Sequence, residues 1–338
     1  MIIITEKQKK ILLQAQQKLQ NDKNINDYES KYLLLCIDVL LNGNDKNIRG
    51  VNVKSLFCET IKKINIKQIE NNKGVLKILF PLLTHRKVGI INLVKEVIKI
   101  LNGDTDVRDM QKVWGGNTNK EFLQKRKLDN IIDPGFLGPM YGYQIRHFNA
   151  PFVKIDENTM AYIKQNKLGY DQLNNLILSI KKNPHTRTLL MTTFNPEQVQ
   201  SGCLYPCTGI IMQYECNETD INNIMYQRSA DLLIGVPYNV LMYSLITAII
   251  GHLTNKKTQY TNIVLGDVHI YENHIPLFIQ MIENYKIHKS AILEIDLQNI
   301  NSINDLNKLT TNNFKIIDYF YEKPITYIME VGENYIKK

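Results

Sequence analysis

The residues best suited to chemistry begin with a thiol that follows a proline. Tyr205-Pro206-Cys207 comes directly before an apolar segment that reads as a strand. Taken alone, a cysteine at the entrance of a strand is more often a small core residue than a nucleophile. Its interpretation therefore depends on the polar residues that accompany it.

Three further polar groups follow this thiol along the chain. Arg228-Ser229 pairs a guanidinium with a hydroxyl, which suits a phosphate because the planar fork forms two parallel charge-assisted bonds. Asn239 lies in an otherwise apolar helix. It is either a core amide with satisfied partners or a reader of a nucleotide base, since an amide donates and accepts at once. His269 and Tyr271 stand two apart on a predicted strand, on one face, where both can hold one ribose.

Helix and strand patterns alternate along the chain and predict the elements that position these residues. Helical spacing of apolar residues predicts helices over 5–22, 28–43, 88–101, 173–182 and 234–253. Strands are expected within 51–80 and over 188–194, 208–215, 262–271 and 291–297, whereas 115–140 reads as irregular because it is rich in Gly, Asn and Pro. We expect the fold class to be α/β (α+β): a single domain whose large mixed β-sheet is flanked by helices.

Composition limits the function classes. With 44% hydrophobic and 22% charged residues, the 338-residue chain resembles an ordinary globular protein. The formal net charge is +8, but no run of five like charges occurs, so we read the excess as a solvated surface rather than a nucleic-acid face. The apolar stretch 234–253 contains Pro237, Asn239 and His252, which favours a buried helix over a membrane span.

The five cysteines indicate free thiols. Their number is odd, their spacing is unpaired, and the first residues do not read as a secretory signal, so we expect a reducing, cytoplasmic location. Cys203 and Cys207 lie four apart without a nearby Cys or His pair, so no structural metal is expected.

Taken in order, the motifs resemble the thymidylate synthase family, which includes the pyrimidine hydroxymethylases. The resemblance covers about Tyr28 to Glu330 and rests on FPLLTHRKV (80–88), LGPMYGYQIRHF (137–148), YPC (205–207), YQRSAD (226–231), GVPYN (235–239) and GDVHIYENH (266–274). It implies a catalytic domain over 28–331, an N-terminal helical extension over 1–27 and a C-terminal extension over 332–338. It also implies a sheet packed at a homodimer interface, with active sites shared between the subunits.

The resemblance implies a role for each candidate residue. Cys207 would add to C6 of dUMP, so that C5 can take a one-carbon unit from 5,10-methylenetetrahydrofolate. Glu96 would be the general acid–base, Tyr141 would join its hydrogen-bond network, and Asn239 would select uracil. The nucleotide would be held by phosphate-binding residues of one subunit (Arg49, Arg228 and Ser229), by the partner's counterpart of Arg187, and by the ribose-binding pair His269 and Tyr271. Trp114 would pack on the folate, and Asp231 would hold its pterin ring.

The chain departs from the family pattern in four places. Thr208 stands where the family has a histidine, and Thr188 stands where it has a second phosphate-binding arginine. Gly115-Gly116-Asn117 replaces acidic and aromatic residues after Trp114, and the chain runs on through GENYIKK beyond the family's usual end. We expect weaker phosphate binding and looser control of water. Two alternatives to thymidylate synthase therefore remain. One is a deoxyuridylate hydroxymethylase, in which water instead of hydride would add to the one-carbon unit on C5. The other is a non-catalytic nucleotide- or RNA-binding homologue.

Overall fold

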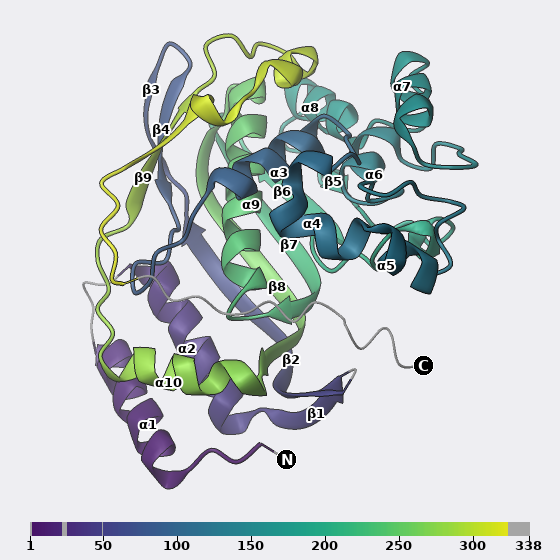
Figure 1. The fold of residues 1–338 in the computed structure, drawn as a ribbon. Helices are drawn as coiled ribbons and strands as arrows, with labels where there is room; N and C mark the ends of the chain where they lie inside the picture. The colour runs from purple at the N-terminus through teal and green to yellow at the C-terminus, as the bar shows by residue number, and fades with distance from the viewer. Residues whose placement is uncertain (1, 22–25, 49, 324–338) are drawn as a thin grey trace.

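Two β-sheets and the helices on them form the framework of the protein (Figure 1). The computed structural model describes residues 2–21, 26–48 and 50–323. Its α-helices are α1 (Glu6–Asn21), α2 (Asp27–Asn42), α3 (Ile91–Leu101), α4 (Gln111–Thr118), α5 (Lys120–Lys125), α6 (Gly142–His147), α7 (Glu157–Gln165), α8 (Gln172–Lys182), α9 (Gly235–Thr254) and α10 (Ile275–Glu283). Its strands are β1 (Asn44–Ile48), β2 (Val51–Asn65), β3 (Gln68–Asn72), β4 (Val75–Phe80), β5 (Leu190–Met191), β6 (Ile211–Cys216), β7 (Asp220–Asp231), β8 (Lys257–Tyr271), β9 (Ala291–Asp296) and β10 (Phe314–Ile317).

The larger sheet is mixed and carries most of the candidate site. Its strand order is β1-β2-β8-β7-β6-β5, in which β7 and β8 run parallel and the other neighbours run antiparallel. The second sheet, β10-β9-β4-β3, is antiparallel. Helix α9 connects β7 to β8. Because these two strands run parallel, the end of β7 and the start of β8 lie at opposite edges of the sheet, and the connection must cross over.

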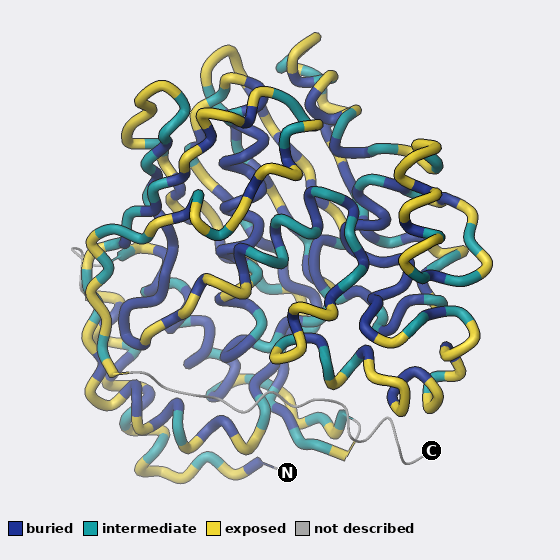
Figure 2. The backbone as a smooth tube through the Cα atoms, turned by 45° about the horizontal axis from the view of Figure 1, so that its top comes forward, coloured by how far each residue is buried: buried dark blue, intermediate teal, exposed yellow. Residues whose placement is uncertain are grey.

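Helix α9 covers one face of this sheet and is almost wholly buried. It contacts β7 and β8, and α3 packs on its other side, so apolar residues surround it. Within the described ranges, α9 is the helix that is long and apolar enough to cross a membrane, but 83% of its most apolar window is buried in the fold. The burial colouring of Figure 2 places the buried backbone in the middle of the molecule. The expected buried helix is therefore confirmed.

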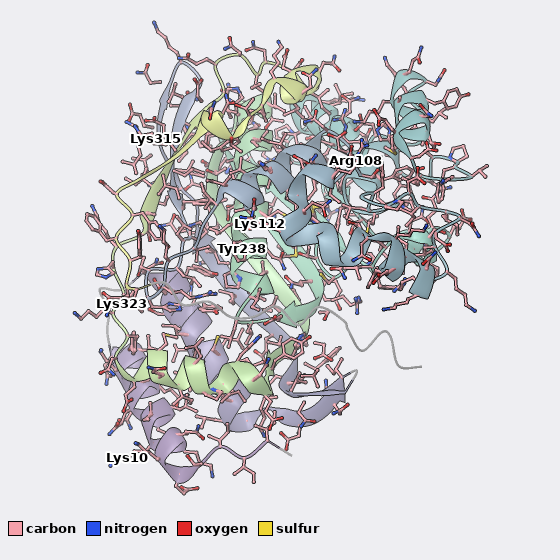
Figure 3. All side chains as sticks on the ribbon, in the orientation of Figure 1. Lys10, Arg108, Lys112, Tyr238, Lys315 and Lys323 are labelled. Atoms are coloured by element: carbon pink, nitrogen blue, oxygen red, sulfur yellow. The ribbon has the colours of Figure 1, made fainter. Side chains whose placement is uncertain are left out.

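The opposite face of β6 and β7 is not covered by these helices. Side chains on β6 alternate strictly between exposed and buried, and Ile211 is 42% exposed. On β7, Ile224 is 45% exposed. Charged side chains do not gather on one such surface. Lys10 on α1, Arg108 beside α4 and Lys315 on β10 lie on separate elements around the molecule (Figure 3). This spread agrees with a solvated distribution of the positive charge.

Two sequence-based expectations about elements are wrong. The region 115–140 is not wholly irregular, because Trp114 to Thr118 continue α4 and α5 follows, capped by the Asn119 side chain on Phe122 N. The strand expected over 188–194 shrinks to β5. The backbone of Thr192 bonds instead to the Gln172 side chain, with its N–H donating at 2.9 Å and its carbonyl accepting at 2.7 Å. A side chain on α8 thus takes the place of a strand partner. The mixed α/β domain itself is confirmed.

A buried carboxylate fixes the loop that leads into α3. Glu29 on α2 is fully buried and accepts from Thr84 N (2.8 Å), Thr84 Oγ1 (2.7 Å) and His85 N (2.7 Å). The His85 ring also lies 2.5 Å away through Nδ1, and burial lowers the pKa of this histidine, so the neutral ring donates. One side chain therefore satisfies the backbone of a loop that has no strand partner there.

We expect Glu29→Gln to lower the free energy of unfolding by about 2 kcal/mol or more, because its amide nitrogen would face donors and leave at least one unsatisfied. Urea unfolding followed by circular dichroism measures the change. The matched control is Glu6→Gln on the exposed start of α1. A Glu29→Gln protein that unfolds within about 0.5 kcal/mol of wild type would contradict this account of the loop.

Candidate active site

The thiol predicted as nucleophile lies in a turn held from two sides. Cys207 is partly buried in the segment before β6, and its Sγ lies 3.5 Å from the Tyr141 hydroxyl oxygen. From β7, Arg228 N donates to Cys207 O at 2.8 Å and Arg228 Nε donates to Pro206 O at 3.2 Å. The Arg228 guanidinium also lies 4.9 Å from the centre of the Tyr205 ring. The strand and the tyrosine thus set the position of the sulfur.

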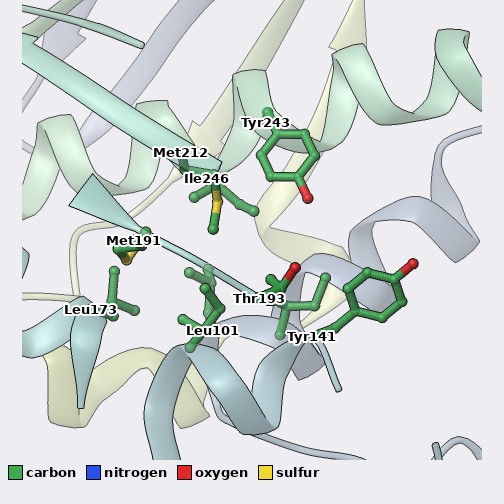
Figure 4. Close-up of a pocket in the computed structure, with 10 residues that line it drawn as sticks. Leu101, Tyr141, Leu173, Met191, Thr193, Met212, Tyr243 and Ile246 are labelled. Carbon is green, nitrogen blue, oxygen red and sulfur yellow. The ribbon is translucent and has the colours of Figure 1, made fainter. Parts of the chain in front are cut away.

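Tyr141 adopts a strained backbone conformation to reach this turn. Its φ is +47° just before α6, a region that non-glycine residues enter at a cost of about 1–3 kcal/mol. The next residue, Gly142, packs closely, because a Cβ there would lie 3.0 Å from Ile100 Cα and would crowd that backbone. Behind the ring is a small apolar pocket shared with Tyr243 (Figure 4), whose other lining side chains include Leu101, Ile145 and Ile246. Apolar packing therefore holds the ring while its hydroxyl faces the thiol.

Glu96 is the carboxyl of the site. It lies on α3, and burial raises its pKa from 4.5 to about 7. The indole of Trp114 on α4 partly offsets this effect. The buried indole N–H is thus directed toward Glu96, although the contact is not a hydrogen bond of ordinary length. A carboxyl with a pKa near neutral can take and return a proton, which is what general acid–base catalysis needs.

The same burial acts on the thiol. It raises the pKa of Cys207 above its usual value, the Tyr141 hydroxyl and Arg228 lower it, and a charged Glu96 raises it further. Burial also raises the pKa of Tyr141, which keeps this hydroxyl protonated and able to donate. The free thiol is thus mainly protonated at neutral pH, and Arg228 is the cation that favours the thiolate.

The predicted base reader, Asn239, is part of a short amide chain. Its Nδ2 donates to Gln227 Oε1 at 3.0 Å, and Gln227 Nε2 donates to Ser229 O at 2.9 Å. Asn239 lies in the first turns of α9, and Gln227 is buried on β7. This chain fixes the side-chain orientation and leaves the Asn239 carbonyl oxygen available to accept from a ligand.

The remaining predicted ligand-binding residues adjoin one another at the end of β8. The rings of His269 and Tyr271 are 5.2 Å apart in an edge-to-face arrangement. Asp231, at the end of β7, is paired in register with His269 and accepts from Leu233 N at 3.1 Å. Burial raises the pKa of Asp231, while His269 and His274 lower it.

One predicted phosphate ligand, Arg187, is not brought to this group by its own chain. Arg187 lies exposed between α8 and β5, and within the described ranges no hydrogen bond or ion pair joins it to the site. Arg49 lies outside the described residues. Thr188 is exposed and its hydroxyl meets that of Thr186 at 2.9 Å. Thr208 is buried, with Oγ1 3.6 Å from Met225 Sδ, and its hydroxyl also interacts with the hydroxyl of Tyr243.

The sequence interpretation missed two supporting residues. Gln227 orients Asn239, and its place inside the motif YQRSAD, beside Arg228, is the signal that could have identified it. Tyr243 packs its hydroxyl against Gly209, where a Cβ would lie only 2.1 Å from that oxygen. Its place one turn after Asn239 was the only hint, because an apolar helix does not reveal which tyrosine points inward.

A mixed-sheet domain in which a thiol interacts electrostatically with a cation, Arg228, and with a near-neutral carboxyl, Glu96, has the features of an enzyme with a covalent nucleophile. The family model for thymidylate synthase matches residues 30–331. The chain is 33% identical over 297 residues to the thymidylate synthase of Human herpesvirus 8 type P, covering 86% of this chain and 81% of that protein. It is 31% identical over 329 residues to the thymidylate synthase of Candida albicans, covering 90% and 98%.

A third relative, the thymidylate synthase of Equine herpesvirus 2, is 35% identical over 259 residues, which cover 75% of this chain and 83% of that protein. The chain belongs to the thymidylate synthase family. The names of these relatives favour the synthase over the hydroxymethylase alternative.

The raised pKa of Glu96 predicts how stability depends on pH. Between pH 4.5 and about 7 the folded protein keeps a proton on Glu96 that the unfolded chain releases, so the free energy of unfolding falls as the pH rises. Glu96→Gln removes this term. It should stabilise the protein at pH 8 by about 1–3 kcal/mol and change little near pH 4.

Urea unfolding at the two pH values measures this difference, with Glu121→Gln on the exposed face of α5 as the control. If wild type and Glu96→Gln show parallel stability curves from pH 4 to pH 8, the burial of this carboxyl is not what sets its pKa.

Proposed function

We propose that this protein converts dUMP to dTMP with 5,10-methylenetetrahydrofolate as co-substrate, through a covalent bond between Cys207 and C6 of the pyrimidine. The observation that carries the proposal is the shared position of the Cys207 thiol, the Tyr141 hydroxyl, Arg228 and the near-neutral Glu96. Family membership supplies the reaction, and this geometry supports the roles of the individual residues.

In the proposed first step, the Cys207 sulfur adds to C6 and electron density moves through C5 toward O4 of the base. Arg228 favours the thiolate that adds. A neutral Glu96 donates a proton toward O4, because its raised pKa keeps a large fraction protonated at pH 7. C5 then acts as the carbon nucleophile that takes the one-carbon unit. C5 then loses its hydrogen as a proton while the bond between the one-carbon unit and the folate nitrogen breaks. When hydride from the folate adds to the one-carbon unit, the Cys207 sulfur departs and the double bond between C5 and C6 is restored.

The folate would supply the one-carbon unit and the hydride that reduces it to a methyl group. The residues present fit such a ligand. The Trp114 indole is buried beside Glu96, and its N–H is directed toward that carboxyl, which leaves the apolar ring to pack against a flat ligand. Asp231 offers a poorly solvated carboxyl to a donor edge such as that of a pterin. Trp114 and Asp231 would therefore orient the co-substrate and help to exclude water.

The nucleotide would be held by its base, ribose and phosphate separately. The free carbonyl of Asn239 matches the N3–H of uracil, while its amide can reach O4. His269 and Tyr271 would hold the ribose, and Arg49, Arg228 and Ser229 would hold the phosphate. Arg187 would complete the phosphate site of a partner subunit.

A homodimer is part of this proposal. Arg187 is exposed and makes no hydrogen bond or ion pair with its own site among the described residues, whereas Ile211 and Ile224 expose an apolar sheet face that the helices leave open. Packing two such faces together would bury this surface and bring Arg187 to the neighbouring site. We also place the enzyme in the cytoplasm, where its five free thiols stay reduced.

The division of the chain follows the same proposal. Residues 1–27 would be an extension, supported by α1 packing on α10 and α2 outside the two sheets. Residues 28–331 would be the catalytic domain. The proposed C-terminal extension, 332–338, lies outside the described residues.

The covalent step predicts a trapped adduct. Wild-type protein mixed with 5-fluoro-dUMP and methylenetetrahydrofolate should gain the mass of both ligands, because the fluorine at C5 cannot leave as the proton does and the bound folate is therefore not released. Cys207→Ser should form no adduct and lose turnover by about four orders of magnitude or more. Cys203→Ser, which alters a buried thiol four residues away, is the control and should keep the adduct. An adduct that persists in Cys207→Ser would assign the nucleophile to another residue.

The shared site predicts complementation between two damaged subunits. Arg187→Ala should raise KM for dUMP about tenfold or more, since a charge-assisted phosphate contact contributes about 1.5–3 kcal/mol. Mixed with Cys207→Ala, it should recover activity at low dUMP, because one site of each heterodimer then has an intact Cys207 and the partner's intact arginine. A mixture without recovery, despite subunit exchange proven by mass spectrometry, would mean that Arg187 serves its own chain or no site.

A further inference from the structure

The loop between β7 and α9 is held by two side chains from a distant part of the chain. The Tyr32 hydroxyl on α2 donates to Leu232 O at 2.8 Å, and Arg86 Nη2 donates to Leu233 O at 2.6 Å. Tyr32 is fully buried and Arg86 is 5% exposed. Two consecutive carbonyl groups of the loop are therefore fixed from outside it.

The same two peptide units bind the Asp231 carboxylate through their other ends. Leu233 N, which shares a peptide unit with Leu232 O, donates to Asp231 Oδ1 at 3.1 Å. Ile234 N, which shares a peptide unit with Leu233 O, donates to the same oxygen at 3.3 Å. Because a peptide unit is planar, fixing its carbonyl also fixes the direction of its N–H. Two hydrogen-bond chains thus run from the two side chains through the backbone to Asp231, and we call them the peptide relay.

The peptide relay orients the Asp231 carboxylate. Both N–H groups point at Oδ1, and within the described ranges no hydrogen bond is made to Oδ2. The backbone is tied to the sheet as well, because Asp231 is paired in register with His269, whose backbone oxygen accepts from Leu232 N at 3.0 Å. One carboxylate oxygen is thus held by the protein, and the other is left to accept from a ligand.

Arg86 is the stronger of the two anchors, because it is charged. A hydrogen bond from a cation polarises the peptide unit that accepts it, and the N–H at the other end of that unit becomes a better donor. Burial raises the pKa of Asp231, and this effect is offset in part by His269, by His274 and by the two N–H groups of the loop. The charge of Arg86 therefore supports the Asp231 carboxylate through a single peptide unit.

The loop that carries Arg86 is itself firmly attached. Glu29 accepts from the backbone N–H groups of the two residues before Arg86. On both sides of it, the Tyr319 hydroxyl donates to Leu83 O at 2.7 Å and accepts from Val88 N at 2.9 Å. These contacts fix the point from which the guanidinium reaches the loop after β7.

We propose that Arg86 and Tyr32 are positioning residues that hold the Asp231 carboxylate in the orientation in which it binds the donor edge of a pterin. The inference rests on the proposed function, because it concerns the folate of that site. It assigns the peptide relay to folate affinity and leaves nucleotide binding and the covalent chemistry to other residues.

The first test separates loss of the peptide relay from loss of one positive charge. Arg86→Met removes the guanidinium and keeps an apolar stem, whereas the control Lys87→Met removes the charge of an exposed neighbour. Binding is measured by calorimetry with tetrahydrofolate, which has no one-carbon unit to transfer, on protein saturated with dUMP. Arg86→Met should raise the Kd for tetrahydrofolate about tenfold or more, and Tyr32→Phe about threefold, with the Kd for dUMP changed less than about twofold. Lys87→Met should change neither Kd by more than about twofold.

A double-mutant cycle shows whether Arg86 acts through Asp231. In an Asp231→Asn background, Arg86→Met should change the Kd for tetrahydrofolate less than about twofold, because the carboxylate that it orients is already gone. An arginine that contacted the folate directly would instead give additive losses. Arg86→Lys, which keeps a cation and a donor, should recover most of the affinity.

A second measurement needs no folate. In the ligand-free protein, Arg86→Met should speed hydrogen exchange of the Ile234 amide about tenfold, and Tyr32→Phe should do the same for the Leu233 amide, while amides in the middle of α9 are unchanged. Exchange is followed by NMR, and circular dichroism shows whether each variant is folded. If Arg86→Met does not fold, Tyr32→Phe carries the same test on the neighbouring peptide unit.

Three results would overturn the role of the peptide relay and leave the proposed function standing. They are an unchanged Kd for tetrahydrofolate in Arg86→Met and Tyr32→Phe, equal losses in Arg86→Met and Lys87→Met, and additive losses when Arg86→Met is combined with Asp231→Asn. If the wild-type protein saturated with dUMP does not bind tetrahydrofolate, or does not bind dUMP at all, the proposed function and the role of the peptide relay fail together.

Discussion

The burial of the Glu96 and Cys207 side chains is the constraint on which the rest of the site depends. Burial raises the pKa of both groups, and a negative charge on Glu96 raises the pKa of Cys207 further. The pocket therefore accommodates one negative charge more readily than two, and Arg228 is the cation beside it. Loss of the proton from the Cys207 thiol and retention of the proton on Glu96 are therefore coupled electrostatically. Such a pocket suits a reaction that moves charge from sulfur to a pyrimidine oxygen and back.

The fold supplies this environment through a few close contacts. Helix α9 shields one face of the sheet, α3 packs on α9 and presents Glu96, and α6 begins at the strained Tyr141. Gly142 and Gly209 allow backbone to approach Ile100 and Tyr243 at distances that no side chain would tolerate. Strain at Tyr141 persists because these contacts determine its position from several sides. The backbone conformation of Tyr141 is therefore locally destabilising, and it keeps the Tyr141 hydroxyl against the Cys207 thiol.

Sequence reasoning predicted the long periodic elements and the residues held in short motifs. Helix α9 and the strand bearing His269 were clear from apolar periodicity, and Cys207 followed from its motif. It failed where side chains replace backbone pairing, as at Thr192, and where a glycine pair continues a helix after Trp114. Neither local propensity nor spacing could indicate that Gln227 orients Asn239, or that Lys46 reaches across β2 to Asp267, because both contacts depend on strand register.

The departures from the family pattern bear on the fate of the one-carbon unit. Thr208 is buried against Met225 and its hydroxyl interacts with Tyr243, so this position offers a hydroxyl to the site's surroundings where the family has an imidazole. The most direct test of the central claim is the mass of the nucleotide formed from dUMP and methylenetetrahydrofolate by the wild-type protein. Our account predicts a nucleotide heavier by one methylene group, with dihydrofolate formed in equal amount. A product carrying one additional oxygen, or unchanged dUMP despite proven binding, would contradict it.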